Sequence, residues 1–118
     1  MKVETFTPLD LFKPIGPYSH ITKIGPFINI SGTPGIDPLT KELAGDDVFT
    51  QSQQILRNLK LMLESVGATF DNVMHIHVFL KKADDFPEMN RAYEEAFEEN
   101  YPARTVICVA DLPKKGRY

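Results

Sequence analysis

The sequence predicts an α+β domain in which two amphipathic helices cover one face of a β-sheet. The first third is dense in glycine and proline between short apolar runs, which is typical of strands and hairpins. Two later segments carry apolar residues at helical spacing instead. Each of these segments is followed by an apolar run that suits a strand. The 118 residues fit a single domain that spans positions 1–118.

The N-terminal third is expected to form short strands at about 2–6, 18–24 and 26–31, with a proline-rich loop to about residue 45. A helix of roughly five turns should follow, because its apolar residues recur at helical spacing. These residues are Val48, Ile55, Leu56, Leu59, Met62, Leu63 and Val66. Asp46 or Asp47 can cap its start, and Gly67 can end it in the left-handed conformation.

The second half predicts strand, helix and strand. NVMHIHVFLK (72–81) alternates, with Met74, Ile76, Val78 and Leu80 on the inward face and His75, His77 and Phe79 on the other. DDFPEMNRAYEEAFEEN (84–100) is a second amphipathic helix with an apparent capping box at its start, formed by Asp85 and Glu88. Its inward residues would be Phe86, Met89, Tyr93, Ala96 and Phe97. The last clear strand covers about 104–110. The sheet face away from the helices would be partly apolar, which leaves room for association.

Composition excludes several classes of protein. A net charge of −3 argues against a general phosphate-backbone binder, which needs a basic face. The one basic cluster is Lys114, Lys115 and Arg117. No apolar run approaches the length of a membrane span, and the N-terminus lacks a secretory signal. The single cysteine, Cys108, favours a reducing compartment. We therefore expect a soluble cytoplasmic protein without nucleic-acid or membrane partners.

One arginine stands out in NYPARTVICV (100–109). Alternation places Arg104 and Val106 on one face of the strand and Thr105 and Ile107 on the other. Because the side rich in valine and isoleucine would pack on helices, we expect Arg104 on the face away from them. Spacing alone leaves two alternatives. The side chain reaches water, or its planar guanidinium binds an anion, for which bidentate capture of a carboxylate is well suited.

Other candidate residues have simpler interpretations. Cys108 would be a nucleophile only beside a base, and none is evident, so we expect a small buried side chain. His75 and His77 share one strand face, but a metal site needs a third ligand that the sequence does not identify. We expect a polar or interface-facing position for them and no metal. SGTPG (31–35) lacks the spacing and the lysine of a phosphate-binding loop.

Five motifs follow one another along the chain. They are GPYSH (16–20), INISGTPGIDP (28–38), LESVGATFDNV (63–73), VFLKKADDFPEMNRAYEEAF (78–97) and YPARTVICVADLP (101–113). In this order they resemble the RidA (YjgF-type) family of reactive-intermediate, or imine, deaminases. The Pro-Ala-Arg segment and the Phe-x-x-x-Asn-x-x-Tyr helix are the most specific parts, and the resemblance runs from about residue 5 to the end.

The resemblance implies a chorismate-mutase-like α+β fold in a homotrimer, with ligand clefts between subunits and neither cofactor nor metal. The implied activity is that of a 2-iminobutanoate/2-iminopropanoate deaminase, which hydrolyses enamines and imines such as 2-aminoacrylate to a 2-oxo acid and ammonia. One alternative is a non-catalytic trimer that binds 2-oxo acids or other carboxylates as a sensor or chaperone-like protein. A ribonuclease or translation inhibitor is less favoured, because the acidic balance provides no basic stripe.

The resemblance also implies particular site residues. Arg104 matches the arginine that grips the substrate carboxylate, and Tyr18 matches the tyrosine that closes the cleft. Ser31 and Gly32 match the small residues that line it. Asn90 matches a helix asparagine whose role is structural more than catalytic.

Backbone groups from Arg104 through Thr105 to Val106 would position the imine nitrogen and the attacking water. Val106 stands where the family often has cysteine, but the mechanism needs the backbone there and not a thiol. Cys108 is offset and does not inherit that role. The family's final strand bears a glutamate that positions water, and counting places it about one residue after Tyr118. We expect weakened catalysis without that strand, whereas the carboxylate pocket would survive.

Overall fold

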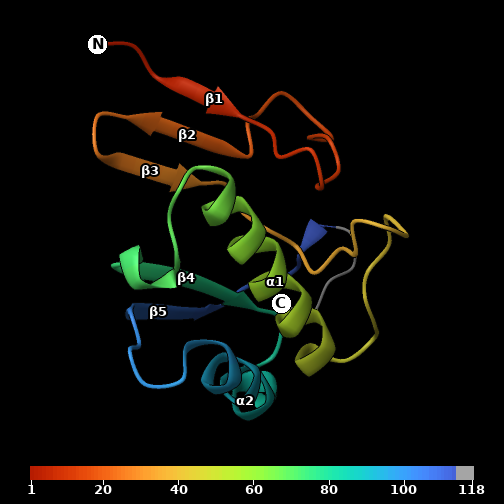
Figure 1. Cartoon of the computed structure of the whole chain (residues 1–118). Helices are drawn as coiled ribbons and strands as arrows, with labels where there is room; N and C mark the ends of the chain where they lie inside the picture. Colours follow the sequence, from red (N-terminus) through yellow and green to blue (C-terminus); the bar gives the residue numbers. More distant parts are fainter. Residues whose placement is uncertain (114–118) are drawn as a thin grey trace.

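A computed structural model describes residues 1–113, so the basic cluster of Lys114, Lys115 and Arg117 lies outside the described residues. The strands form two separate sheets, and a long helix lies along both of them (Figure 1). The predicted α+β class with two helices is confirmed. The single predicted sheet is not found in the described part of the chain, because no hydrogen-bonded ladder joins β3 to β4.

The N-terminal sheet is antiparallel, in the order β1-β2-β3. Its strands are β1 (Glu4–Phe6), β2 (Ile21–Ile24) and β3 (Phe27–Ile30). Strands β2 and β3 form a tight hairpin, with Ile21 opposite Ile30. Gly25 takes a φ of +57° in the turn, a conformation that glycine adopts without steric cost. The three strands predicted here therefore form, each shorter than expected.

Helix α1 (Val48–Ser65) begins and ends where the sequence predicts. The Asp47 carboxylate accepts a hydrogen bond from the backbone N–H of Thr50 at 2.8 Å, which caps the first turn. Just beyond the last turn, Gly67 takes a φ of +77° in the left-handed region. A 3-10 turn, η1 (Phe70–Asn72), then leads into the second sheet.

The second sheet contains β4 (His75–Leu80) and β5 (Ala103–Cys108), which pair in parallel. The 3-10 turn η2 (Ala83–Asp85) and helix α2 (Phe86–Phe97) connect them, as a parallel pair requires a long crossover. The predicted capping box is wrong. Asp85 has a helical φ of −82° and makes no capping hydrogen bond, whereas a capping residue is normally extended. Glu88 instead pairs with Arg91 at 2.7 Å.

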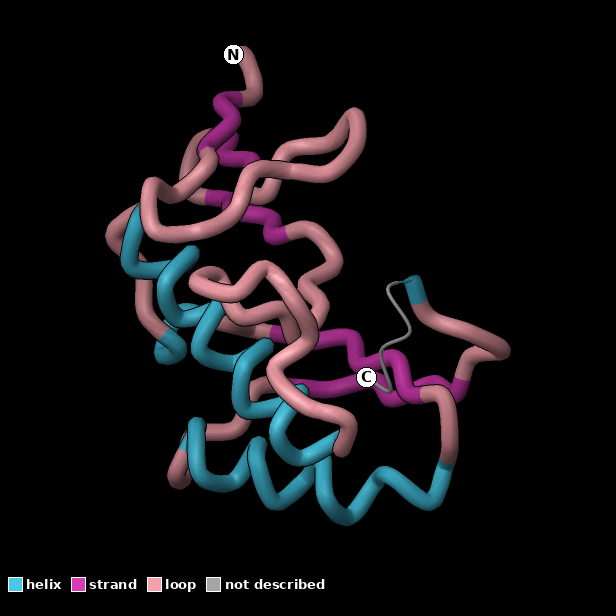
Figure 2. The backbone as a smooth tube through the Cα atoms, turned by 90° about the vertical axis from the view of Figure 1, so that its right-hand side faces the viewer, coloured by secondary structure: helices cyan, strands magenta, loops and turns pink. Residues whose placement is uncertain are grey.

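Helix α1 separates two apolar clusters. One joins α1 and α2 to the β4–β5 pair and has as its buried members Val48, Leu56, Val78, Leu80, Met89, Ala92, Tyr93 and Phe97. The other joins the opposite part of α1 to the N-terminal sheet, around Leu11, Ile21 and Met62. Figure 2 shows the same arrangement from the side, with the two groups of strands at separate levels along the helix. Both helices therefore cover one face of β4–β5, as predicted.

The opposite face of β4–β5 is open and mixed in character. Phe79 is 45% exposed and Ile107 is 47% exposed, and His75 and His77 lie on the same face. Met74, predicted to face inward, is exposed because it precedes the first paired residue of β4. Within residues 1–113, neither helix is both long and apolar enough to span a bilayer.

Candidate functional site

Arg104 lies near the start of β5, on the face that the helices cover. The parallel register pairs Arg104 with Ile76 and Val106 with Val78. Side chains of paired residues on adjacent strands point to the same face of a sheet. Ile76, Val78 and Val106 all pack in the cluster beneath the helices. The predicted position of Arg104, away from the helices, is therefore wrong.

The wrong face was predicted for Arg104 because the pattern of β5 was considered without its paired strand, β4. Ile107 pairs with the exposed Phe79, whereas Val106 pairs with the buried Val78. Composition favoured the side of β5 that carries Ile107 as the inner side. The register with β4 instead places that side on the open face of the sheet. Ile76 and Val78 had been assigned to the inner face correctly, so pairing β5 in parallel with β4 is the signal that would have placed Arg104.

The guanidinium of Arg104 meets one face of α2. Its Nη1 donates to Asn90 Oδ1 at 2.8 Å and lies 3.7 Å from the sulfur of Met89. Its Cζ lies 4.9 Å from the ring centre of Tyr93 and 5.4 Å from that of Phe86. Phe86 precedes Met89 and Asn90 by three and four residues, and Tyr93 follows them by four and three, so all four share one side of the helix. Sequence reasoning had found only Asn90 among them.

No acid neutralises Arg104 among the described residues, where the ion pairs are Lys81–Asp111 and Arg91–Glu88. Burial raises the pKa of Tyr93 to about 12, against a smaller opposite effect of the Arg104 charge. The phenol therefore stays neutral at physiological pH and cannot act as a counter-ion. Within residues 1–113, the Nε and Nη2 donors of Arg104 make no hydrogen bond, so they can meet a ligand.

Strand β5 also presents backbone groups near Arg104. The N–H groups of Ala103 and Val109 point toward β4, where they donate to the carbonyls of Met74 and Leu80. Backbone groups alternate between the two edges of a strand. Those of Arg104 and Val106 therefore face the other edge of β5, which has no strand partner in the described part of the chain. The Arg104 guanidinium thus lies on the helix-covered face of β5, and backbone groups without a strand partner in residues 1–113 lie along the edge of the same strand.

Three other predicted residues lie on the N-terminal sheet side. Tyr18 is exposed, and its ring packs edge-on against His20 with ring centres 5.8 Å apart. Ser31 donates its hydroxyl to the carbonyl of Ser19 at 2.5 Å. Gly32 is exposed, and a side chain at that position would meet nothing within 4 Å. This group therefore has open space beside it.

The two groups of predicted residues do not meet within residues 1–113. No hydrogen bond or ring contact joins Arg104 or Asn90 to Tyr18, Ser31 or Gly32. Arg104 and Asn90 lie on β5 and α2, whereas the other three residues lie in loops next to the N-terminal sheet, and Figure 1 shows the two sheets at separate levels of the molecule. One chain thus brings together the arginine, the asparagine and the β5 edge, and leaves the tyrosine and the small residues apart.

Two other residues of β5, Thr105 and Cys108, do not contact the Arg104 guanidinium. Thr105 faces away from the helices, where its hydroxyl lies 2.9 Å from His75 Nε2. The rings of His75 and His77 are 4.7 Å apart, and the described residues contain no group of three potential metal ligands. Cys108 is exposed, so its predicted burial is wrong. It is the last residue of β5, and among the described residues only one of the two edges of β5 is paired.

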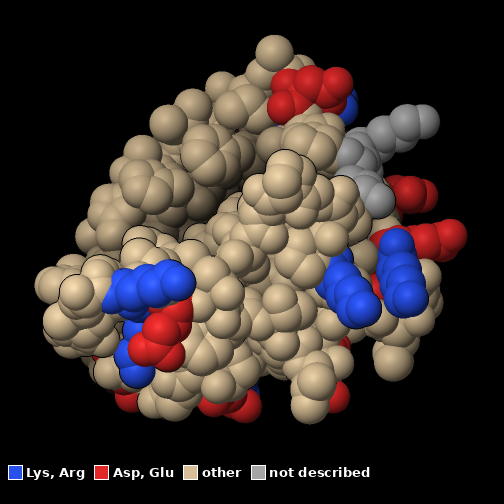
Figure 3. Space-filling view, turned by 90° about the horizontal axis from the view of Figure 1, so that it is seen from above, with Lys and Arg blue, Asp and Glu red and all other residues tan. Residues whose placement is uncertain are grey.

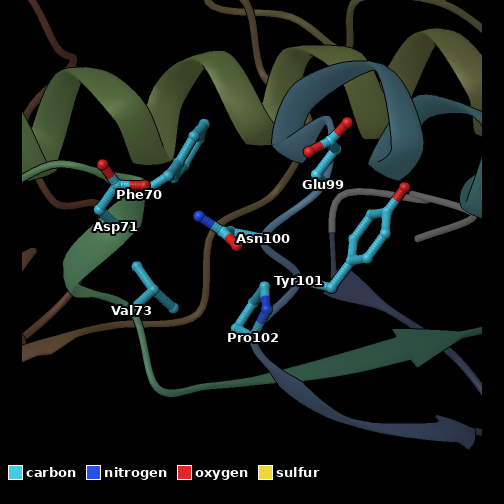
Figure 4. A pocket seen from close by; sticks show the side chains of 7 residues that line it. All are labelled: Phe70, Asp71, Val73, Glu99, Asn100, Tyr101 and Pro102. Carbon is cyan, nitrogen blue, oxygen red and sulfur yellow. The ribbon is translucent and has the colours of Figure 1, made fainter.

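Two hollows lie near the ends of these elements. A cavity of about 380 Å³ lies just before β5 (Figure 4) and is lined by Phe70, Asp71, Val73, Glu99, Asn100, Tyr101 and Pro102. A second, of about 460 Å³, lies between the starts of the two helices and is lined by Asp46, Asp47, Val48, Phe49, Asp85 and Glu88. Arg104 lines neither, so these two hollows do not enclose its free donors.

Comparison with known proteins gives consistent matches over most of the chain. Residues 9–117 match the family model described as Endoribonuclease L-PSP. A RutC family protein of Pyrococcus abyssi is 43% identical over 102 residues, which cover 86% of this chain and 80% of that protein. The 2-iminobutanoate/2-iminopropanoate deaminase of Homo sapiens is 38% identical over 103 residues, covering 87% of this chain and 75% of the human protein.

Solved structures agree with these matches. RidA from the Antarctic bacterium Psychrobacter sp. PAMC 21119 superimposes with a TM-score of 0.91 at 33% identity, covering 97% of this chain and 92% of that one. TdcF of E. coli, solved with bound serine, gives a TM-score of 0.91 at 28% identity, covering 97% and 91%. The arrangement of helices and strands described above is therefore shared with these proteins.

Proposed function

Because this chain belongs to the Endoribonuclease L-PSP family, which includes the RidA and YjgF proteins, we propose that it is an enamine/imine deaminase. The proposed reaction is hydrolysis of a 2-imino acid, or of the enamine that tautomerises to it, to a 2-oxo acid and ammonia. The observation that carries the proposal is the Arg104 guanidinium, which is oriented by an amide, is not neutralised by any acid among the described residues, and has free donors.

The proposed chemistry follows from this geometry. Arg104 holds the carboxylate of the imine through its free donors, which turns a random encounter into an oriented one. The carbon next to the carboxylate is electrophilic, and water adds to it. Backbone groups of Arg104 and Val106 at the open edge of β5 orient the imine nitrogen and the water. An acid or a chain of waters must then protonate the departing ammonia. The proposal assigns that step to no residue of this chain.

We further propose that the working unit is a homotrimer with clefts between subunits. Arg104 and the group of Tyr18, Ser31 and Gly32 do not meet within one chain, so a second copy would have to supply one of them. The open face of β4–β5 supports this, since Phe79 there is nearly half exposed. Association through that face would cover apolar surface that water otherwise contacts.

Mixing two inactive variants tests this assembly. Arg104→Ala removes the anchor, and Gly32→Trp fills the open space on the other sheet. If each cleft combines residues of two subunits, about a quarter of the clefts in a randomly mixed trimer contain both intact groups, and activity returns. If activity does not return although sedimentation shows that the subunits have mixed, the shared cleft is wrong.

The activity itself is tested with 2-aminoacrylate made in situ from serine by a dehydratase, and pyruvate release is followed. This protein should accelerate release, and Arg104→Ala should abolish the acceleration. Arg91→Ala is the matched control, because Arg91 also lies against an aromatic ring but is paired with Glu88. Full activity in Arg104→Ala would refute the assigned site.

One other function is supported by a specific observation. The bound serine in TdcF of E. coli is a small amino acid held by a protein of this fold. A carboxylate-binding sensor would need the Arg104 site but no step of chemistry. Carboxylate binding that depends on Arg104, with no acceleration of pyruvate release, would favour the sensor. A ribonuclease is less supported, because the face in Figure 3 shows basic side chains in separate groups and not in a stripe.

A further inference from the structure

Two arginines, one on α2 and one beneath it, lie against aromatic rings, and they differ in whether an acid pairs with them. Arg91 lies 3.6 Å from the ring centre of Phe49 and forms a salt bridge with Glu88 at 2.7 Å. The hydrogen bond that Arg91 donates to the Glu88 carboxylate is the main cause that raises the pKa of Arg91. Arg104 also lies against aromatic rings, but none of the described acids contacts it. The first cation therefore has an anion partner within residues 1–113, and the second does not.

The rings around Arg104 are fixed by the helix. Phe86 is the first residue of α2 and Tyr93 lies two turns later, so both project from one side of the helix. Tyr93 is only 3% exposed and packs in the core, whereas Phe86 is 38% exposed at its edge. Asn90 lies between them and contacts Nη1. The guanidinium thus contacts two rings, and one of its ends is tied to an amide.

Aromatic rings act on a guanidinium in two ways. They attract the cation through their negative faces, within about 6 Å of the ring centre. They also displace water from the guanidinium while leaving its edge donors exposed, and the edge is where a carboxylate binds in a bidentate manner. Unlike an acid, a ring holds the cation without neutralising it. An arginine held this way is both positioned and still charged.

We propose that Phe86 and Tyr93 are positioning residues for carboxylate capture by Arg104. They hold the guanidinium with its charge uncompensated and its Nε and Nη2 edge free, so that a small carboxylate becomes its counter-ion. The inference rests on the proposed function for its ligand. It adds a requirement that the proposed function does not contain, namely that the rings set the affinity for the carboxylate.

Phe86 is the residue to change, because its exposure makes the fold tolerant of substitution there. Phe86→Leu keeps the apolar character and removes the ring, and Phe86→Tyr restores a ring. Phe49→Leu is the matched control, since it removes the ring beside Arg91. Tyr93→Phe keeps the ring that faces Arg104. Each variant is titrated calorimetrically with 2-oxobutanoate, and KM and kcat are measured in the 2-aminoacrylate assay. Thermal unfolding confirms that each is folded.

Phe86→Leu should raise both Kd and KM by about three- to thirty-fold and leave kcat nearly unchanged. Phe86→Tyr and Tyr93→Phe keep a ring beside Arg104 and should lose much less affinity than Phe86→Leu. Phe49→Leu should bind as the unmodified protein does. A folded Phe86→Leu variant with unchanged Kd and KM would overturn the inference, as would an equal loss of affinity in Phe49→Leu.

The two proposals fail in different ways. If Arg104→Ala abolishes 2-oxobutanoate binding and Phe86→Leu does not weaken it, only the positioning role is wrong. If the unmodified protein does not bind 2-oxobutanoate, or if Arg104→Ala binds it normally, the proposed function loses its site. In that case, NMR of the Arg104 Nε–H proton still tests whether the rings hold the guanidinium. It should exchange faster with water in Phe86→Leu than in Phe49→Leu, and equal exchange would overturn the holding role.

Discussion

Replacing Asn90 with aspartate should preserve the fold and weaken carboxylate binding, although the change is nearly isosteric. The amide oxygen of Asn90 accepts from Arg104 Nη1 at 2.8 Å. A carboxylate at the same position would form a charge-assisted hydrogen bond, which is about twice as strong as a neutral one. Stability should therefore be unchanged or higher. The cost falls on the ligand, because Arg104 would then carry its counter-ion within the chain.

The size of that cost can be worked out from the geometry. Two carboxylates on one guanidinium stand about 5 Å apart and repel by about 3 kcal/mol at an effective dielectric constant of 20. Arg104 is half-buried, so solvent screening reduces this by about half. About 1.5 kcal/mol corresponds to roughly tenfold weaker binding. Calorimetric titration with 2-oxobutanoate measures the affinity, and urea unfolding measures the stability.

Two further variants make this test decisive. Asn90→Ala removes the same hydrogen bond without adding charge, so it should lower stability and weaken binding less than Asn90→Asp does. Gln53→Glu adds a negative charge elsewhere, on α1, and should leave the affinity unchanged. If Asn90→Asp binds 2-oxobutanoate as tightly as the unmodified protein, Arg104 is not the carboxylate anchor. The same result would refute the argument that an acid next to Arg104 competes with the ligand carboxylate.

Three other predictions concern stability and are measured by chemical unfolding. Gly35→Ala should cost about 1–3 kcal/mol, because the added Cβ would lie 2.7 Å from the backbone oxygen of Gln51; an unchanged midpoint would contradict this close approach. Asp47→Ala should cost about 1 kcal/mol by removing the cap of α1, whereas Asp46→Ala should cost little, and equal losses would refute the capping role. Tyr93 keeps its proton more tightly when folded, since its pKa rises from 10.0 to about 12. The free energy of unfolding should therefore fall as pH rises through that window, by at most about 1.4 kcal/mol per pH unit. Tyr93→Phe should remove that part of the slope, and an identical slope would show that the phenol is not protected.

The helices could be predicted from the sequence because their signals are local. The spacing of apolar residues located α1, and Asp47 and Gly67 marked its ends with the conformations that capping requires. The motif around Arg104 likewise identified the family, since those residues are adjacent in the chain. Local signals failed at Asp85. This residue ends the 3-10 turn η2, so its backbone is helical and not extended as expected of a capping residue.

The candidate site could be predicted only in part, because its geometry depends on pairing between distant segments. Asn90 was named with Arg104, and the two are in contact. The face of Arg104 depends on the register of β5 with β4, which joins positions about thirty residues apart and has no local signature. For the same reason the sequence did not identify Phe86 and Tyr93 as neighbours of the arginine. It had assigned them to the inner side of α2 without knowing what lay opposite.

The position of Arg104 on the helix-covered face bears on how binding and association can coexist. Had the arginine been on the open face, as its spacing suggested, a desolvated cation would oppose packing of that face against another copy. The register instead places Arg104 beneath α2 and leaves Phe79 and Ile107 on the open face. A single strand can therefore hold an anion-binding group on one side and an apolar contact surface on the other. The edge of β5 that carries the backbone groups of Arg104 and Val106 is common to both sides, and no strand of the described residues pairs with it. A cleft formed at that edge would have one wall from α2 and could take its other wall from whatever covers the open face.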